Sequence, residues 1–170
     1  SLSKPLAAGL PLSATLIPEK VNRHVEVGDH GTTFGGGPVT AEAGLYMLDR
    51  ITAPAFLQGV RERGAHLDRR LGEAAADLPA VAGLRGAGML RGLEIVAPEA
   101  GGTGGEGTSD GRTAPGGAGR IPQIMKAARE EGLLILRSGS NILRIAPPLI
   151  ITEQEIDRGV EILRYVLEKE

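Results

Sequence analysis

The sequence has no cysteine and no tryptophan, and its only aromatic side chains are two phenylalanines and two tyrosines among 170 residues. The lack of cysteine excludes disulfides, thiolate metal ligands and a cysteine nucleophile. So few aromatic rings cannot form the stacking surface on which single-stranded nucleic acids bind. The net charge of −2 also disfavours a nucleic-acid partner, because such domains usually carry a strongly basic face.

Long apolar runs are missing as well. No run approaches the roughly 18 residues that a membrane span requires, so no membrane partner is expected. The sequence shows no secretory signal, and the lack of cysteine suits a reducing compartment, so we expect a cytoplasmic protein. The sequence begins at Ser1, already inside an apolar segment, and we expect that residues before it are missing.

The residues that are present predict a globular chain, because 41% are hydrophobic and 24% are charged. Pro38 and Pro54 are typical first-turn residues of helices, and Thr152 with Glu155 has the spacing of a capping box. We expect four helices, starting at residues 38, 54, 121 and about 153, and strands within residues 12–17, 81–96, 133–136 and 142–145. This order predicts a mixed fold with an α+β second half.

Glycine, threonine, serine and proline dominate residues 97–120, where apolar side chains are almost missing. A segment of this composition cannot bury a core, so we expect a solvated surface insertion. Residues 102–107 match the pattern G-x-G-x-x-G of dinucleotide-binding proteins, but no amphipathic helix follows, so the match carries little weight. The three histidines have no ligand-like spacing with acidic residues, and no metal site is expected.

Lys4 is one of only four lysines and lies in a stretch of small and apolar residues. An amine that loses hydration in apolar surroundings becomes available as a neutral nucleophile, which suits Schiff-base chemistry. The residue alone is equally typical of an ordinary surface lysine.

Thr32 and Thr33 lie in the glycine-rich loop over residues 28–38, directly before an expected helix. Hydroxyl groups, exposed backbone amides and a helix N-terminus together can bind an anion such as a phosphate. A plain glycine-rich connection between two elements explains the same loop.

Arg144 stands between Leu143 and Ile145 in an expected apolar strand. A guanidinium in that position either pairs with a carboxylate or phosphate, because its charge is costly to bury, or reaches water from an edge strand.

Four segments, taken in order, resemble the class III aminotransferases, which use pyridoxal 5'-phosphate (PLP) and have the α/β fold called fold type I. The segments read SKPLAAGLPL at residues 3–12, HGTTFGG at 30–36, RGAGM at 85–89 and RIAPPL at 144–149. Any one of these motifs is moderate evidence, whereas four in family order are strong evidence. The resemblance covers almost the whole chain apart from residues 97–120.

The resemblance implies a role for each candidate residue. Lys4 corresponds to the lysine that carries the cofactor and moves the proton, and is the catalytic residue. Thr33, with Thr32 beside it, corresponds to the residue that binds the cofactor phosphate of the partner subunit in a homodimer. Arg144 corresponds to the arginine that holds a substrate carboxylate.

The resemblance also implies where the chain divides into domains and that the chain lacks part of the cofactor site. Residues 1–52 would be the end of the large cofactor-binding domain with a connecting helix, and residues 53–170 the small domain with its insertion at 97–120. Gly37 stands where the family often has asparagine. The other cofactor contacts of the family would lie upstream of Lys4, so we expect this chain alone to be inactive.

Within the family, the resemblance is strongest to enzymes that transaminate N-acetylornithine with 2-oxoglutarate in arginine biosynthesis. Related chemistry on ornithine, 4-aminobutyrate or an acetylated lysine stays open as an alternative. So does a non-catalytic dimerisation remnant that has kept this half of the enzyme.

Overall fold

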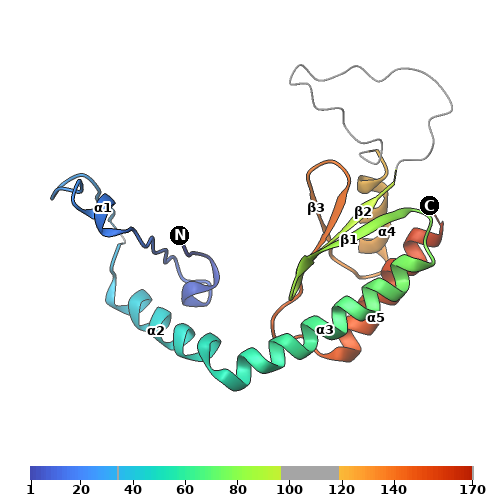
Figure 1. Cartoon of the computed structure of the whole chain (residues 1–170), viewed down its shortest axis with the longest axis horizontal. Helices are drawn as coiled ribbons and strands as arrows, with labels where there is room; N and C mark the ends of the chain where they lie inside the picture. The colour runs from blue at the N-terminus through green and yellow to red at the C-terminus, as the bar shows by residue number, and fades with distance from the viewer. Residues whose placement is uncertain (34, 97–118, 170) are drawn as a thin grey trace, which may run out of the picture. The chain divides into compact units, whose positions relative to one another are not determined.

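The computed structural model describes residues 1–33, 35–96 and 119–169 (Figure 1). These residues form two compact units, Ser1–Gln58 and Gly59–Glu170, whose boundary falls within helix α3 (Pro54–Ala76). The expected domain boundary between residues 52 and 53 stays a prediction. The insertion expected at 97–120 lies outside the described residues up to residue 118.

The first unit is built on helix α2 (Pro38–Thr52), which begins at the expected proline. The 3-10 helix η1 (Pro5–Ala7) packs against α2 and buries Leu6 and Ala7. Gly44 of α2 faces this segment: a Cβ atom there would lie 2.7 Å from Cδ2 of Leu12 and 3.7 Å from the carbonyl oxygen of Leu6. A short helix, α1 (Glu19–Asn22), follows in the same unit.

The strand expected over residues 12–17 does not form, and that prediction was wrong. The segment makes one isolated bridge, in which the amide of Leu2 donates to the Ala14 carbonyl at 2.7 Å and the amide of Ala14 donates back at 2.9 Å. A strand requires a continuous ladder with a partner. The described part of the first unit offers no such partner, and Leu16 is 80% exposed.

The second unit contains a four-stranded antiparallel sheet in the order β1-β2-β4-β3 (Figure 1). The strands are β1 (Val81–Ala87), β2 (Leu90–Ile95), β3 (Leu136–Ser138) and β4 (Ile142–Ile145). The expected hairpin within 81–96 and the strand at 142–145 are therefore confirmed. Together with helices α3, α4 (Ile121–Glu130) and α5 (Glu153–Lys169), they confirm the α+β second half.

Strand β3 begins three residues later than expected, because the residues before it close helix α4. Gly132 adopts φ = 89°, and the amide of Leu133 donates to the Ala128 carbonyl at 2.7 Å. The amide of Gly132 donates to the Arg129 carbonyl at 3.1 Å, which completes a Schellman motif. Leu133 therefore belongs to the helix cap and cannot start the strand.

Helices and sheet enclose one hydrophobic core on a single face of the sheet. Leu84, Leu93 and Leu143 are partners in register across β1, β2 and β4, and Leu143 is completely buried. The core also contains Leu71 from α3, Ile121 and Ile124 from α4, and Ile156, Val160 and Val166 from α5. Side chains alternate along a strand, so Arg85, Glu94 and Arg144 point to the opposite face, where Arg85 and Arg144 are exposed.

The expected capping box starts helix α5. The amide of Glu155 donates to Oγ1 of Thr152 at 3.2 Å, and the amide and hydroxyl of Thr152 both donate to Oε2 of Glu155 at 2.8 Å. These bonds satisfy amides that the first turn of a helix would otherwise leave unpaired.

Replacement of Thr152 by alanine should lower the free energy of unfolding by about 1 kcal/mol, the usual cost of a lost N-cap. Urea unfolding of the whole chain, followed by circular dichroism, measures the change. Thr152→Ser is the matched control, because it keeps the hydroxyl and should keep most of the stability. Equal losses in both variants would show that the methyl group matters and the cap does not.

Candidate functional site

Lys4 lies directly before η1 in an unusual backbone conformation. Its φ and ψ are 61° and −84°, close to the strained classic γ-turn. Among the described residues, only Lys4 and Ala8 are non-glycine residues with positive φ. Each such conformation costs roughly 1–3 kcal/mol and is typical of active sites and ligand clamps. The backbone at Lys4 therefore supports a functional role that the sequence pattern alone could not indicate.

The side chain of Lys4 is exposed, and the expected apolar surroundings are not found among the described residues. The apolar neighbours of the sequence, Leu6 and Ala7, turn away from it and are buried against α2. Within this chain the amine of Lys4 is exposed to water.

Thr32 and Thr33 are exposed and lie in the turn region before α2, as expected. Two open cavities adjoin this loop, one of about 250 Å³ lined by Thr33 and Pro38 and one of about 400 Å³ lined by Thr32 and Gly36. Pro11, which belongs to the same N-terminal segment as Lys4, lines both cavities. The first unit thus brings the lysine segment and the threonine loop together, whereas Phe34 lies outside the described residues.

Arg144 lies in β4, an interior strand of the sheet, so the expected edge-strand position was wrong, whereas the side chain does reach water as that interpretation expected. The alternative of a buried Arg144 paired with an anion was wrong in its burial, because the side chain is exposed on the face opposite the core. Within the described part of the second unit, no side-chain hydrogen bond or ion pair joins the Arg144 guanidinium to another residue, although its backbone pairs with both neighbouring strands. A guanidinium in this state can accept a bidentate carboxylate or phosphate ligand.

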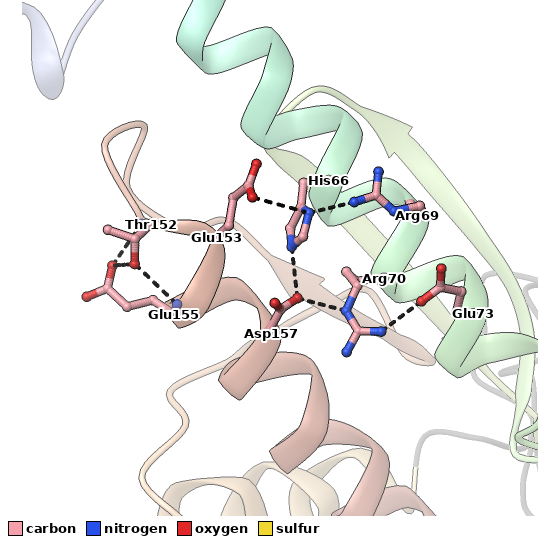
Figure 2. A network of polar contacts seen from close by, with 8 residues as sticks. All are labelled: His66, Arg69, Arg70, Glu73, Thr152, Glu153, Glu155 and Asp157. Atoms are coloured by element: carbon pink, nitrogen blue, oxygen red, sulfur yellow. Dashed lines mark hydrogen bonds and ion pairs between the residues drawn. The ribbon is translucent and has the colours of Figure 1, made fainter.

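A second polar cluster, which the sequence did not reveal, joins α3 to α5 (Figure 2). His66 is buried and its Nε2 atom lies 2.8 Å from Oδ1 of Asp157, a residue 91 positions away. Nη2 of Arg69 lies 2.7 Å from Nδ1 of His66. Arginine can only donate, so Nδ1 accepts from Arg69 and Nε2 donates to Asp157, while Oε2 of Glu153 lies 4.0 Å from Nδ1 (Figure 2).

The cluster is an ion-pair network between the two helices. Asp157 also accepts from Nε of Arg70 at 2.7 Å, and Arg70 donates to Glu73 at 2.7 Å (Figure 2). Among the described residues, no group of three or more histidine and acidic side chains has an arrangement that could hold a metal ion. We therefore assign this cluster to the attachment of α5 to α3.

Acid should weaken this attachment. The hydrogen bond from Arg70, and after it the one from His66, hold the pKa of Asp157 below its ordinary value of 3.8. The unfolded chain then binds a proton more readily, so the contribution to stability is full above the ordinary pKa and disappears as pH falls through the folded-state value. The Asp157→Asn variant should accordingly have a lower free energy of unfolding than the parent near pH 7. Below about pH 4 the free energies of unfolding of the two proteins should become similar.

Urea unfolding midpoints of the parent and the variant between pH 7 and pH 3 test this expectation. Glu161→Gln, which removes one negative charge from an exposed position of α5, is the control. A stability difference between parent and Asp157→Asn that stays constant over this pH range would contradict the assignment.

Comparison with known proteins places these residues in a family. Residues 1–167 match the family model described as aminotransferase class-III. The chain belongs to the class-III aminotransferase family. The match spans both units, so the lysine segment, the threonine loop and the strand of Arg144 all lie within it.

Individual relatives agree with this assignment. The chain is 38% identical to a mitochondrial acetylornithine aminotransferase of Alnus glutinosa over 98% of its length and 32% of the relative's length. It is 32% identical to an acetylornithine aminotransferase of Streptococcus mutans, covering 99% of this chain and 39% of the relative. The crystal structure of acetylornithine aminotransferase from Elizabethkingia anophelis is similar, with a TM-score of 0.72 and 26% identity, and covers 97% of this chain and 39% of that one.

These comparisons confirm the resemblance to class III aminotransferases and the α/β fold of the family. The chain spans only about a third of the length of the curated relatives it matches. No helix in the described residues is long and apolar enough to cross a membrane. The expected cytoplasmic location stays a prediction, because the relatives named above include a mitochondrial enzyme.

Proposed function

We propose that this chain carries the cofactor lysine, a phosphate-binding loop and a substrate-binding arginine of a PLP-dependent aminotransferase. The observation that carries the proposal is the strained, exposed Lys4 in a segment packed beside the loop of Thr32 and Thr33. The family match over residues 1–167 supports it.

The residues of the first unit fit PLP chemically. The exposed amine of Lys4 is the group that can bond to the cofactor aldehyde. The hydroxyls of Thr32 and Thr33, next to the N-terminus of the 15-residue helix α2, suit the doubly charged phosphate. By the resemblance, Thr33 binds the cofactor phosphate of the partner subunit rather than that of its own chain.

PLP, when bound, supplies an electron sink for the carbon that bears the substrate amine. Lys4 would have two tasks: Nζ would hold the cofactor, and the same amine would act as the base that takes the proton from that carbon and then as the acid that delivers it to the cofactor. Arg144 binds a substrate carboxylate through two parallel N–H···O bonds and so fixes the orientation of the reacting carbon.

The substrates we propose are N-acetylornithine as the amino donor and 2-oxoglutarate as the acceptor, in arginine biosynthesis. The names of the relatives from Alnus glutinosa and Streptococcus mutans support this choice. Ornithine, 4-aminobutyrate and N-acetyllysine are competing donors, because the chain spans about a third of those relatives and holds few of the residues that select the donor.

A homodimer is part of the proposal. Helix α2 exposes Val39 (73%), Leu45 (60%) and Tyr46 (69%), a large apolar surface for one helix. Exposed apolar surfaces of this kind are typical of protein interfaces. A role for Thr33 at the partner's cofactor is consistent with such an interface next to α2.

The proposal is tested by an assay of the protein at the length its gene encodes, with PLP and 2-oxoglutarate. Glutamate formation should be fastest, as kcat/KM, with N-acetylornithine, when ornithine, 4-aminobutyrate and N-acetyllysine are compared as donors. A preference for another donor would refute the substrate, and no turnover with any donor would favour the non-catalytic dimerisation module. The 170-residue chain alone should show no turnover, because Lys4 is hydrated and the chain provides few cofactor contacts.

A further inference from the structure

The face of the sheet opposite the core carries three charged side chains in a regular arrangement. Arg85, Gly92 and Arg144 are partners in register across β1, β2 and β4, so their side-chain positions form one row on this face. Gly92 contributes no side chain, and Cγ of Arg85 lies 3.6 Å from the position a Cβ atom there would take. Cγ2 of Ile142 lies closer still to that position, at 2.9 Å, so the side chains of Ile142 and Arg85 together cover the glycine between the two arginines.

Glu94, two residues further along β2, lies diagonally between the two arginines. Its direct partners are Gly83 on β1 and Ile142 on β4, so Arg85 and Arg144 are its diagonal neighbours on either side. Diagonal pairs on one face of a sheet lie within reach of long side chains. Glu94 could therefore form an ion pair with either arginine.

In the structure Glu94 pairs with Arg85 and leaves Arg144 alone. Nη2 of Arg85 donates to Oε2 of Glu94, and Nδ2 of Asn141 donates to Oε1 at 3.2 Å. Both carboxylate oxygens thus have a donor. The side chain of Glu94 is less exposed to water than that of its partner: 31% of it is exposed, against 60% for Arg85.

We propose that Arg85, assisted by Asn141, is a positioning residue that engages Glu94 and thereby keeps Arg144 free for the carboxylate of a substrate. The inference rests on the proposed function, because that function makes Arg144 the carboxylate ligand. Without Arg85, Glu94 on the adjacent strand is an acidic side chain that the strand register places diagonally to Arg144. A substrate carboxylate would then have to displace Glu94.

The availability of Arg144 can be measured on the 170-residue chain with phenylglyoxal, which reacts with guanidine groups and reacts more slowly with ion-paired ones. Mass spectrometry of peptides gives a rate for each arginine. Arg137, exposed on β3 and without an ion pair among the described residues, is the internal reference.

We expect Arg144 and Arg137 to react at similar rates in the parent chain. Arg85→Met should slow Arg144 about two- to fivefold, as expected for an ion pair at a surface, and leave Arg137 unchanged. Arg85→Met with Glu94→Gln should restore the parent rate, and Arg85→Lys should keep it. Asn141→Ala removes only the second donor to Glu94, so it should slow the reaction of Arg144 with phenylglyoxal less than Arg85→Met does. If Arg85→Met does not fold, Asn141→Ala tests the inference on its own.

The inference is overturned if Arg144 reacts equally fast with and without Arg85, or if the slower rate persists when Glu94 is glutamine. A separate measurement distinguishes it from the proposed function: 2-oxoglutarate should protect Arg144 from phenylglyoxal in the protein at the length its gene encodes. If the variants behave as expected but 2-oxoglutarate gives no protection, Glu94 is held by Arg85 as inferred and the proposed role of Arg144 is wrong.

Discussion

Replacement of Lys4 by alanine should lower kcat for transamination by about a thousandfold or more in the protein at the length its gene encodes, because one amine both holds the cofactor and transfers the proton. The strained backbone at this residue, with φ = 61°, agrees with a position maintained for chemistry rather than for stability. Borohydride reduction in the presence of PLP, followed by peptide mass spectrometry, should label Lys4 in the parent protein.

The matched control is Lys20→Ala, which removes another exposed lysine of the same unit and should leave kcat and labelling unchanged. Loss of activity with retained labelling elsewhere would assign the cofactor to a different lysine. If Lys4→Ala kept full activity, the resemblance of the SKPLAAGLPL segment would have misidentified the catalytic residue.

Truncation of Leu143 to alanine should destabilise the second unit by about 3 kcal/mol, within the range of about 2–5 kcal/mol for a buried leucine. Leu143 is completely buried, and its register partners Leu93 and Leu84 hold the centre of the sheet against the helices. The cost combines lost apolar burial with the cavity that rigid neighbours cannot fill. Urea unfolding of the whole chain measures it.

Leu134→Ala is the control for this truncation, because Leu134 is 83% exposed. Its effect should stay within about 0.5 kcal/mol, as usual for surface positions. A loss below 1 kcal/mol for Leu143→Ala would mean that the second unit closes around the vacancy.

Local signals in the sequence were sufficient to predict most elements. Pro38 and Pro54 begin helices because their fixed φ suits the first turn, and Thr152 with Glu155 caps α5 as the spacing predicts. The failures have non-local causes. The segment 12–17 has the residue types of a strand but has no partner strand among the described residues. Leu133 is part of the C-terminal cap of α4.

The candidate site shows the same distinction. Motifs indicated Lys4, Thr33 and Arg144 because each residue type suits one chemical task. The pairing of Glu94 with Arg85 depends on strand register, which single-residue patterns do not fix. Likewise, His66 and Asp157 meet only after α3 and α5 have packed together.

The alternation of side chains along strand β4 limits which insertions and deletions the protein can tolerate. Leu143 and Arg144 are adjacent in the chain but face the core and the solvent, respectively. An insertion or deletion of one residue in the connection to β3 that shifted the register would exchange the two, placing a charge in the core and a leucine at the proposed carboxylate site. Stability and ligand binding would be lost in a single event, so selection for folding alone also preserves the orientation of the arginine.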